Sequence, residues 1–172
     1  MKIGLFYGST TCYTEMVAEK IQALIGADVV DLHNIKTVPL ARMADYQLLI
    51  LGLSTWDFGE IQEDWEAHWD EISQVDLSGR TIAIYGMGDQ IGYAEWFIDA
   101  VGMLHEAIAG QQPNRIGFWP ASGYDFIASK ALTADGELFY GLALDDENQY
   151  EQTDERLNAW VSQILTEIAE QL

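Results

Sequence analysis

Short apolar runs alternate with amphipathic segments along the whole chain. The apolar runs predict β-strands at residues 2–7, 28–32, 46–53, 81–86, 115–119 and 138–144. The run from Leu48 to Leu53 is apolar throughout, which is typical of a parallel strand that is covered on both faces. We therefore expect a parallel sheet.

The segments between these strands repeat apolar residues with the 3.6-residue period of a helix. The positions that should face the core are Val17, Ile21 and Ile25, flanked by Met16 and Leu24; Trp65, Trp69 and Ile72; Trp96, Phe97, Ala100, Val101, Leu104 and Ile108; and Leu157, Trp160, Val161, Ile164, Leu165 and Ile168. Thr153 is the expected N-cap of the last helix, with Asp154 and Glu155 in its first turn. This alternation predicts a doubly wound α/β fold with helices on both faces of the sheet.

One domain is expected over residues 1–172, because no repeat, low-complexity tract or linker divides the chain. Only residues 120–137 interrupt the alternation. This segment is long for a loop in a compact domain, which is typical of functional loops, and its aromatic residues Tyr124 and Phe126 allow it to pack.

Charge restricts the class of partner. Twenty-eight acidic residues against eight basic ones give a formal net charge of −20. Such a surface repels nucleic acids and anionic membranes and complements basic proteins, although the acidity could also serve solubility alone. The single cysteine allows no internal disulfide, and no apolar stretch approaches the ~20 residues that span a bilayer. We expect a monomer in the cytoplasm.

The first strand runs into a hydroxyl-rich turn, G-S-T-T-C-Y-T-E at residues 8–15, which opens a helix. Backbone N–H groups, hydroxyl donors and the positive end of a helix dipole together favour a phosphate group. Because the loop has no lysine, a monophosphate is a better fit than a triphosphate. A turn in which Thr11 or Thr14 only caps the helix is the alternative.

Two more loops follow strands at the same edge, S-T-W-D-F-G-E at 54–60 and G-M-G-D-Q-I-G-Y at 86–93. Each contains glycines and an aromatic residue, Trp56 or Tyr93, and two aromatic side chains that flank one crevice could hold a planar ring between them.

Signatures of catalysis are missing from the sequence. His33, His68 and His105 are dispersed and form no metal-ligand set or catalytic pair. Cys12 has no partner cysteine and no obvious base. The D-F-G at 57–59 lacks the other motifs that a kinase requires. A phosphoacceptor domain would need acidic residues after the first strand, and a nucleotide hydrolase would need a lysine in its loop.

Five segments in order carry a family resemblance: 8–15, 54–65, 86–97, G-Y-D-F-I-A-S-K-A-L from Gly123, and G-L-A-L-D-D-E-N-Q from Gly141. Together they resemble a long-chain bacterial flavodoxin, and Cys12-Tyr13 resembles a second flavodoxin paralogue. The resemblance implies a five-stranded parallel sheet in the order 2-1-3-4-5, with the fifth strand interrupted by the 120–137 insertion.

The resemblance also implies bound FMN. The residues that would enclose its phosphate are Ser9, Thr10, Thr11, Cys12, Tyr13 and Thr14. Ser54 and Thr55 would lie near the phosphate and ribityl chain, Trp56 and Tyr93 would cover the two ring faces, and the loop of Gly88 and Asp89 would position the pyrimidine edge. The turn of Asp57, Phe58 and Gly59 contains the peptide that the resemblance implies will reorient when the flavin is reduced.

The implied function is that of a low-potential one-electron carrier, not an enzyme, which takes electrons from a reductase and delivers them to acceptor enzymes. An FMN-dependent NAD(P)H:quinone reductase on the same fold is the alternative. Residues 57–71 contain seven acidic residues and no lysine or arginine, which favours docking on basic partners such as a flavodoxin reductase. Cys12 replaces the family's glycine, and at a positive φ it would cost something like 1 kcal/mol.

Overall fold

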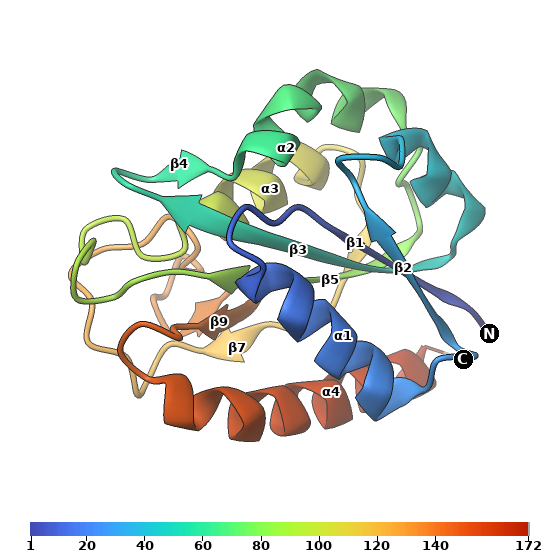
Figure 1. The fold of residues 1–172 in the computed structure, drawn as a ribbon. Coiled ribbons are helices and arrows are strands. Elements are labelled where there is room, and N and C mark those ends of the chain that lie inside the picture. The colour runs from blue at the N-terminus through green and yellow to red at the C-terminus, as the bar shows by residue number, and fades with distance from the viewer. Residues whose placement is uncertain (172) are drawn as a thin grey trace.

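A parallel sheet with helices on both faces forms the centre of the computed structural model, which describes residues 1–171 (Figure 1). The main strands are β1 (Ile3–Tyr7), β2 (Val30–Asn34), β3 (Leu48–Trp56), β5 (Thr81–Met87) and β6 (Asn114–Arg115). They lie in the order β2-β1-β3-β5-β6, and all of these pairings are parallel. The predicted order 2-1-3-4-5 is confirmed.

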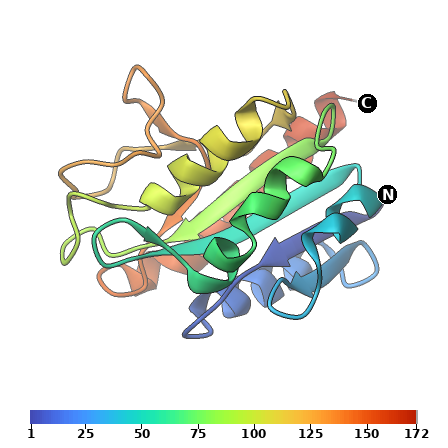
Figure 2. The same cartoon turned by 90° about the horizontal axis from the view of Figure 1, so that it is seen from above.

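The two faces of the sheet bury two separate cores, because successive side chains of a strand point to opposite faces. In β3, Leu49 and Leu51 belong to one core and Ile50 to the other. Helices α1 (Tyr13–Ile25) and α4 (Thr153–Glu170) cover the face of Ile50 (Figure 1). The opposite face is covered by α2 (Glu63–Ala67), α3 (Asp99–Ala109) and the 3₁₀ turns Leu40–Asp45 and Trp69–Gln74 (Figure 2).

The fifth strand is split, as expected, but its pieces are shorter than predicted. β6 pairs with Thr81 and Ile82 of β5, and β9 (Leu142–Leu144) pairs with residues 85–87 further along the same edge. Gly117, with a φ of 78°, directs the chain away from β5 after Ile116. The outer parts of the predicted runs form a separate antiparallel pair, β7 (Trp119–Pro120) with β8 (Leu138–Phe139).

Three helix predictions need correction. The Trp65–Ile72 period is divided between α2 and a 3₁₀ turn that starts at Trp69. The third helix starts at Asp99, because Ile98 has a left-handed φ of 45°, so Trp96 and Phe97 precede it. Thr153 is the first residue of α4 and not its N-cap; its hydroxyl donates to Asp146 Oδ1. A 3₁₀ turn at Tyr150–Gln152 leads into this helix.

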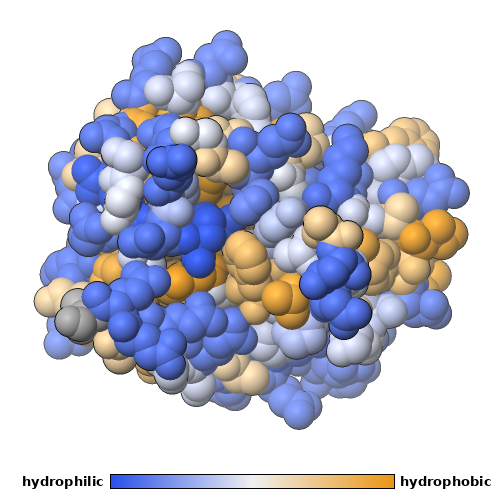
Figure 3. Space-filling model, turned by 180° about the vertical axis from the view of Figure 1, so that it is seen from behind, coloured by the Kyte–Doolittle hydropathy of each residue, from blue (hydrophilic) through white to orange (hydrophobic). Residues whose placement is uncertain are grey.

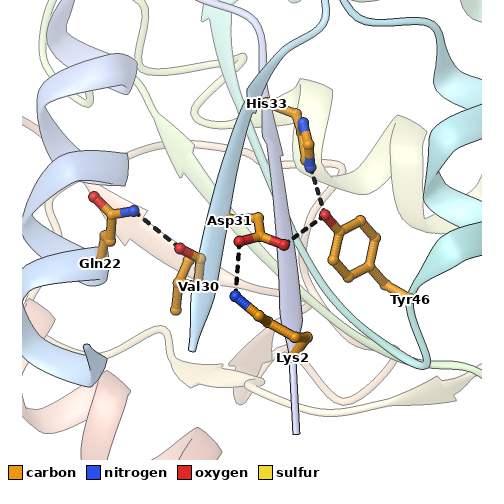
Figure 4. A network of polar contacts seen from close by, with 6 residues as sticks. All are labelled: Lys2, Gln22, Val30, Asp31, His33 and Tyr46. Atoms are coloured by element: carbon orange, nitrogen blue, oxygen red, sulfur yellow. Dashed lines mark hydrogen bonds and ion pairs between the residues drawn. The ribbon is translucent and has the colours of Figure 1, made fainter. Parts of the chain in front are cut away.

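A polar network closes the β2 edge of the sheet (Figure 4). The Tyr46 hydroxyl donates to Asp31 Oδ2 at 2.8 Å and contacts His33 Nε2 at 2.7 Å, while Lys2 Nζ lies 3.2 Å from Asp31 Oδ1. The hydrogen bond from Tyr46 is the largest influence on Asp31 and lowers its pKa. Gly4 leaves room for the Tyr46 ring, because a Cβ there would lie 2.5 Å from Tyr46 Cδ2. Across residues 1–171, no helix is long and apolar enough to cross a membrane.

Candidate functional site

One pocket opens at the carboxyl ends of β1, β3 and β5, where a doubly wound sheet places its ligand. The predicted site residues that line it are Thr11, Tyr13, Thr14, Ser54, Thr55, Trp56, Asp57, Gly88, Asp89 and Tyr93. Three further lining residues, Met87, Asp146 and Glu147, were not predicted. The three loops that the sequence singles out are therefore brought together at one place.

Five other predicted residues are not part of the lining that residues 1–171 form, although each is next or close in sequence to a lining residue: Ser9, Thr10, Cys12, Phe58 and Gly59. The Ser9 Oγ atom is buried and has no hydrogen-bond partner among the described residues. A buried hydroxyl without a partner costs free energy, so Ser9 is a candidate donor to an oxygen atom of a ligand. Cys12 and Phe58 are exposed.

The 9–14 loop leads into α1 through an uncommon backbone conformation. Cys12 has φ 69° and ψ −8°, in the left-handed region, and its carbonyl accepts the N–H of Met16 at 2.8 Å. Thr14, in the first turn, is 2% exposed, and its carbonyl accepts a hydrogen bond from the Tyr85 hydroxyl. The loop thus presents the free N–H groups of a helix start, which attract an anion.

Gln62, which the sequence analysis missed, supports this loop from behind. Its side chain is fully buried; Oε1 accepts the N–H groups of Asp64 and Trp65 at 3.1 and 3.3 Å, and Nε2 donates to Thr10 Oγ1 at 3.1 Å. A Cβ on Gly8 would lie 2.2 Å from Gln62 Oε1, so glycine is required there. Since Thr10 Oγ1 accepts from Gln62, its own hydrogen is free to donate elsewhere. A glutamine directly before a short acidic helix could have been read as an N-cap.

The hydroxyls of Ser54 and Thr55 hold the pocket walls in place. Ser54 Oγ accepts the indole N–H of Trp56 at 2.8 Å, and Thr55 Oγ1 accepts the N–H of Ala100 at 3.0 Å. Ser54 therefore fixes the orientation of Trp56, and Thr55 connects β3 to the start of α3. Each hydroxyl keeps its hydrogen available.

The 57–59 turn carries two residues with a positive φ, Asp57 at 44° and Gly59 at 88°. It closes a hairpin in which β4 (Glu60–Ile61) pairs antiparallel with the end of β3, a strand that was not predicted. The Phe58 side chain is 69% exposed, with ring centroids 5.0 Å from Trp96 and 6.3 Å from Tyr93. The turn is thus backed by aromatic rings but open to solvent.

The electrostatic environment of the pocket is acidic. Asp57, Asp89, Asp146 and Glu147 line it, and the described lining contains no lysine or arginine. Burial, the largest influence on Asp89, opposes its ionisation, but hydrogen bonds from the N–H groups of Gly92 and Ile91 and from Asn148 outweigh it and lower the pKa of this carboxyl. The pocket therefore combines the hydrogen-bond donors of the 9–14 loop, which suit an anion, with four acidic side chains in its lining.

No histidine is part of the lining of this pocket among the described residues. His33 contacts Tyr46, and His105 stacks on Tyr140 with ring centroids 3.7 Å apart and accepts from Arg115. No cluster of three potential metal ligands occurs within residues 1–171. The arrangement is suited to holding a ligand with an anionic tail and a planar ring.

Comparison with known proteins agrees with this geometry. The Flavodoxin family model matches residues 5–160. The chain is 56% identical to Flavodoxin 2 of Salmonella typhi over 170 residues, which covers 99% of this chain and 98% of that protein. It is 48% identical to a flavodoxin of Nostoc sp. over 166 residues, 96% of each chain. The crystal structure of Fusobacterium nucleatum flavodoxin bound to flavin mononucleotide superposes with a TM-score of 0.90 at 26% identity, covering 96% of this chain and 98% of that one. The chain belongs to the flavodoxin family.

Proposed function

We propose that this protein binds FMN in the pocket between β1, β3 and β5 and carries single electrons between other proteins. When bound, FMN supplies one-electron redox chemistry at its ring system. The observation that carries the proposal is that residues of the 9–14 loop and the two aromatic residues Trp56 and Tyr93 line one pocket. The residues of the chain bind the cofactor, orient its ring and set the electrostatic field around it.

The 9–14 loop fits a terminal phosphate. Ser9 Oγ is buried without a partner in residues 1–171, Thr10 is held by Gln62 with its hydrogen free, and Thr14 lies in the first turn of α1. These hydroxyls, with the N–H groups of the helix start, supply hydrogen bonds without a positively charged side chain. This donor set suits a monophosphate.

The opposite end of the pocket fits a flat ring. Trp56 is fixed by Ser54, and Tyr93 belongs to a loop in which Asp89 Oδ1 accepts the N–H groups of Ile91 and Gly92. We assign the two ring faces to these aromatic side chains. The carbonyl of Asp57 is assigned to hold a proton-bearing nitrogen of the ring, because the positive φ values of Asp57 and Gly59 allow the intervening peptides to turn.

The acidic lining is expected to make the bound cofactor strongly reducing. A carboxylate about 8 Å from an added negative charge, at an effective dielectric constant of ~40, costs roughly 1 kcal/mol. Several carboxylates act together here, since Asp146 and Glu147 add to Asp57 and Asp89. We therefore propose a low potential for the second electron.

Titration of the apo-protein with FMN and with riboflavin tests the assignment. One FMN should bind per chain, with quenched flavin fluorescence, and riboflavin should bind far more weakly because it lacks the phosphate. Addition of NAD(P)H alone distinguishes the quinone reductase alternative: a carrier should leave the cofactor oxidised, whereas rapid unaided reduction would favour the reductase. A chain that binds both flavins equally would contradict the phosphate assignment.

We further propose that the ring end of the pocket is the docking face for basic redox partners and that the chain acts as a cytoplasmic monomer. Phe58, Ile91, Tyr93 and Ile127 are exposed by 69%, 55%, 38% and 73% and come from three neighbouring loops. Hydrophobic residues are visible at the right-hand end of Figure 3, the loop end at the left of Figure 1. The seven acids of residues 57–71 start at this face and favour a basic partner.

The rate of electron transfer from a basic flavodoxin reductase should fall as salt rises above about 0.1 M, where the screening length is ~10 Å. The double substitution Glu60→Lys and Asp64→Lys should slow transfer at low salt and have little effect at high salt. If the transfer rate depends neither on salt nor on the two substitutions, the docking proposal is wrong and the acidic residues serve solubility alone.

A further inference from the structure

A buried polar cluster lies behind the pocket wall, apart from the residues that line it. Gln90 and Asp145 are 1% and 0% exposed. Asp145 Oδ2 accepts the backbone N–H of Gln90 at 3.0 Å and its side-chain Nε2 at 2.8 Å. Asp145 Oδ1 accepts the N–H groups of Glu147 and Asn148 at 3.1 and 3.0 Å. A buried carboxylate needs such donors, so this cluster firmly joins the 88–91 segment to the 145–149 turn.

The same glutamine reaches the 120–137 segment. Gln90 Oε1 accepts the N–H of Asp125, and Gln90 Nε2 also donates to Gln149 Oε1 at 2.8 Å. Gln149 Nε2 in turn donates to the carbonyl of Gly123 at 3.2 Å. Both the oxygen and the nitrogen of the Gln90 amide are engaged, and their partners come from parts of the chain far apart in sequence.

The other end of the Tyr93 loop, residues 89–96, is held by the same segment. The carbonyl of Ala94 accepts the N–H groups of Ile127 and Ala128 at 2.8 and 3.1 Å. Tyr93 therefore lies between two attachment points, Gln90 on one side and Ala94 on the other. Tyr93 is 38% exposed, so packing alone holds its side chain weakly.

We propose that Gln90 is a positioning residue through which the 120–137 segment holds Tyr93 over the pocket. The inference rests on the proposed function, in which Tyr93 covers one ring face. Attachment at two points orders the Tyr93 loop before the ligand arrives, and a preorganised loop loses less conformational freedom on binding. The 120–137 segment thus influences the position of the Tyr93 side chain, although none of its described residues lines the pocket.

The variant Gln90→Met keeps a long side chain but removes its amide hydrogen bonds. We expect it to weaken FMN and riboflavin by the same factor, about tenfold, because only the ring end of the pocket is altered. Asp135→Ala is the matched control within the same segment: Asp135 Oδ1 accepts from Thr133 Oγ1 and the Glu137 N–H in an exposed turn away from the Tyr93 loop. This control should bind both flavins as the wild type does.

A double-mutant cycle decides whether Gln90 acts through Tyr93. In a Tyr93→Ala background, Gln90→Met should have little further effect on riboflavin affinity or on the reduction potential of bound FMN. A merely structural role would give the same loss in both backgrounds and would overturn the proposal.

Hydrogen exchange in the wild type provides a test that needs no substitution, and it decides the matter if Gln90→Met does not fold. Bound FMN should slow amide exchange at 123–128 as well as at 90–94. Unchanged exchange at 123–128 would overturn the inference. A wild type that binds no FMN would overturn the proposed function itself, whereas normal FMN binding with an unaffected Gln90→Met variant would overturn this inference alone.

Discussion

Cys12 stores backbone strain that a single substitution can release. Its φ of 69° lies in the left-handed region, where a side chain costs roughly 1–2 kcal/mol and glycine is essentially free of penalty. Glycine also gives the unfolded chain more freedom, which offsets about 0.4–1 kcal/mol of this gain. We therefore expect Cys12→Gly to stabilise the apo-protein by about 0.5–1 kcal/mol.

Cys12→Ala is the control that separates the Cβ from the thiol. Alanine keeps the Cβ and therefore the strain, and Cys12 is exposed, so little packing is lost with the sulfur. Urea unfolding of the three apo-proteins at one pH should rank glycine above alanine and the wild type, with the last two within about 0.5 kcal/mol of each other.

The reasoning would be refuted if glycine were no more stable than alanine, because the strain would then be absent from the apo loop. If Cys12→Ala also raised the free energy of unfolding by a similar amount, the thiol and not the backbone strain would be the cause. FMN titration of the same variants would then show how much of the strain persists when the loop encloses a phosphate.

Further predictions concern the two ends of the pocket and the core. Thr14→Ala should weaken FMN by about 10- to 100-fold and spare riboflavin, while Thr14→Ser should retain FMN; flavin fluorescence measures both. Tyr93→Ala should raise the potential of the second electron because water then reaches the ring, whereas Tyr93→Phe should not; potentiometric titration with no upward shift would reject the stacking role. Burial, with Arg115 adding to it, lowers the pKa of His105 from 6.5 to about 4. Between these two pH values the unfolded chain therefore binds a proton at His105 that the folded chain does not bind. The free energy of unfolding should fall as the pH drops from about 6.5 to about 4. Because His105 is only half-buried, its contribution to the slope of the unfolding free energy against pH should be well under 1.4 kcal/mol per pH unit. Urea unfolding of His105→Gln at the same pH values should lack this contribution, and the difference from the wild type measures it.

The doubly wound α/β class could be predicted because each main strand is a distinct apolar run that is separated from the next by a helical period. The order of the strands came instead from the family resemblance. The ends of the elements could not be predicted. Phe97 fits the helical period of the third helix, yet the helix starts only after Ile98, whose left-handed backbone is fixed by the surrounding structure and leaves no mark in a local pattern.

Residues that follow strand ends can be expected at the pocket from the sequence, whereas residues that act through tertiary contacts cannot. Asp146 and Glu147 follow β9 at the same sheet edge, so inspecting the residues after the last strand would have found them. Gln62 and Gln90 give no such signal, because a neutral amide has a role only once folding has placed its partners around it. Ser9 and Thr10 were expected in the phosphate loop, but their availability as donors depends on those tertiary contacts.

The split partner of β5 also bears on how the protein behaves when it is concentrated. A long open strand edge is a template for pairing with another molecule, and hence for aggregation. Here the outer edge consists of the two-residue β6 and the three-residue β9, and where the chain leaves β5 its backbone is covered by α4. Glu167 accepts the N–H of Gly117, Trp160 donates to the carbonyl of Gly117, and Gln163 donates to the carbonyl of Phe118. Three helix side chains thus occupy hydrogen-bonding groups that a neighbouring copy would otherwise use, which protects this edge from intermolecular strand addition.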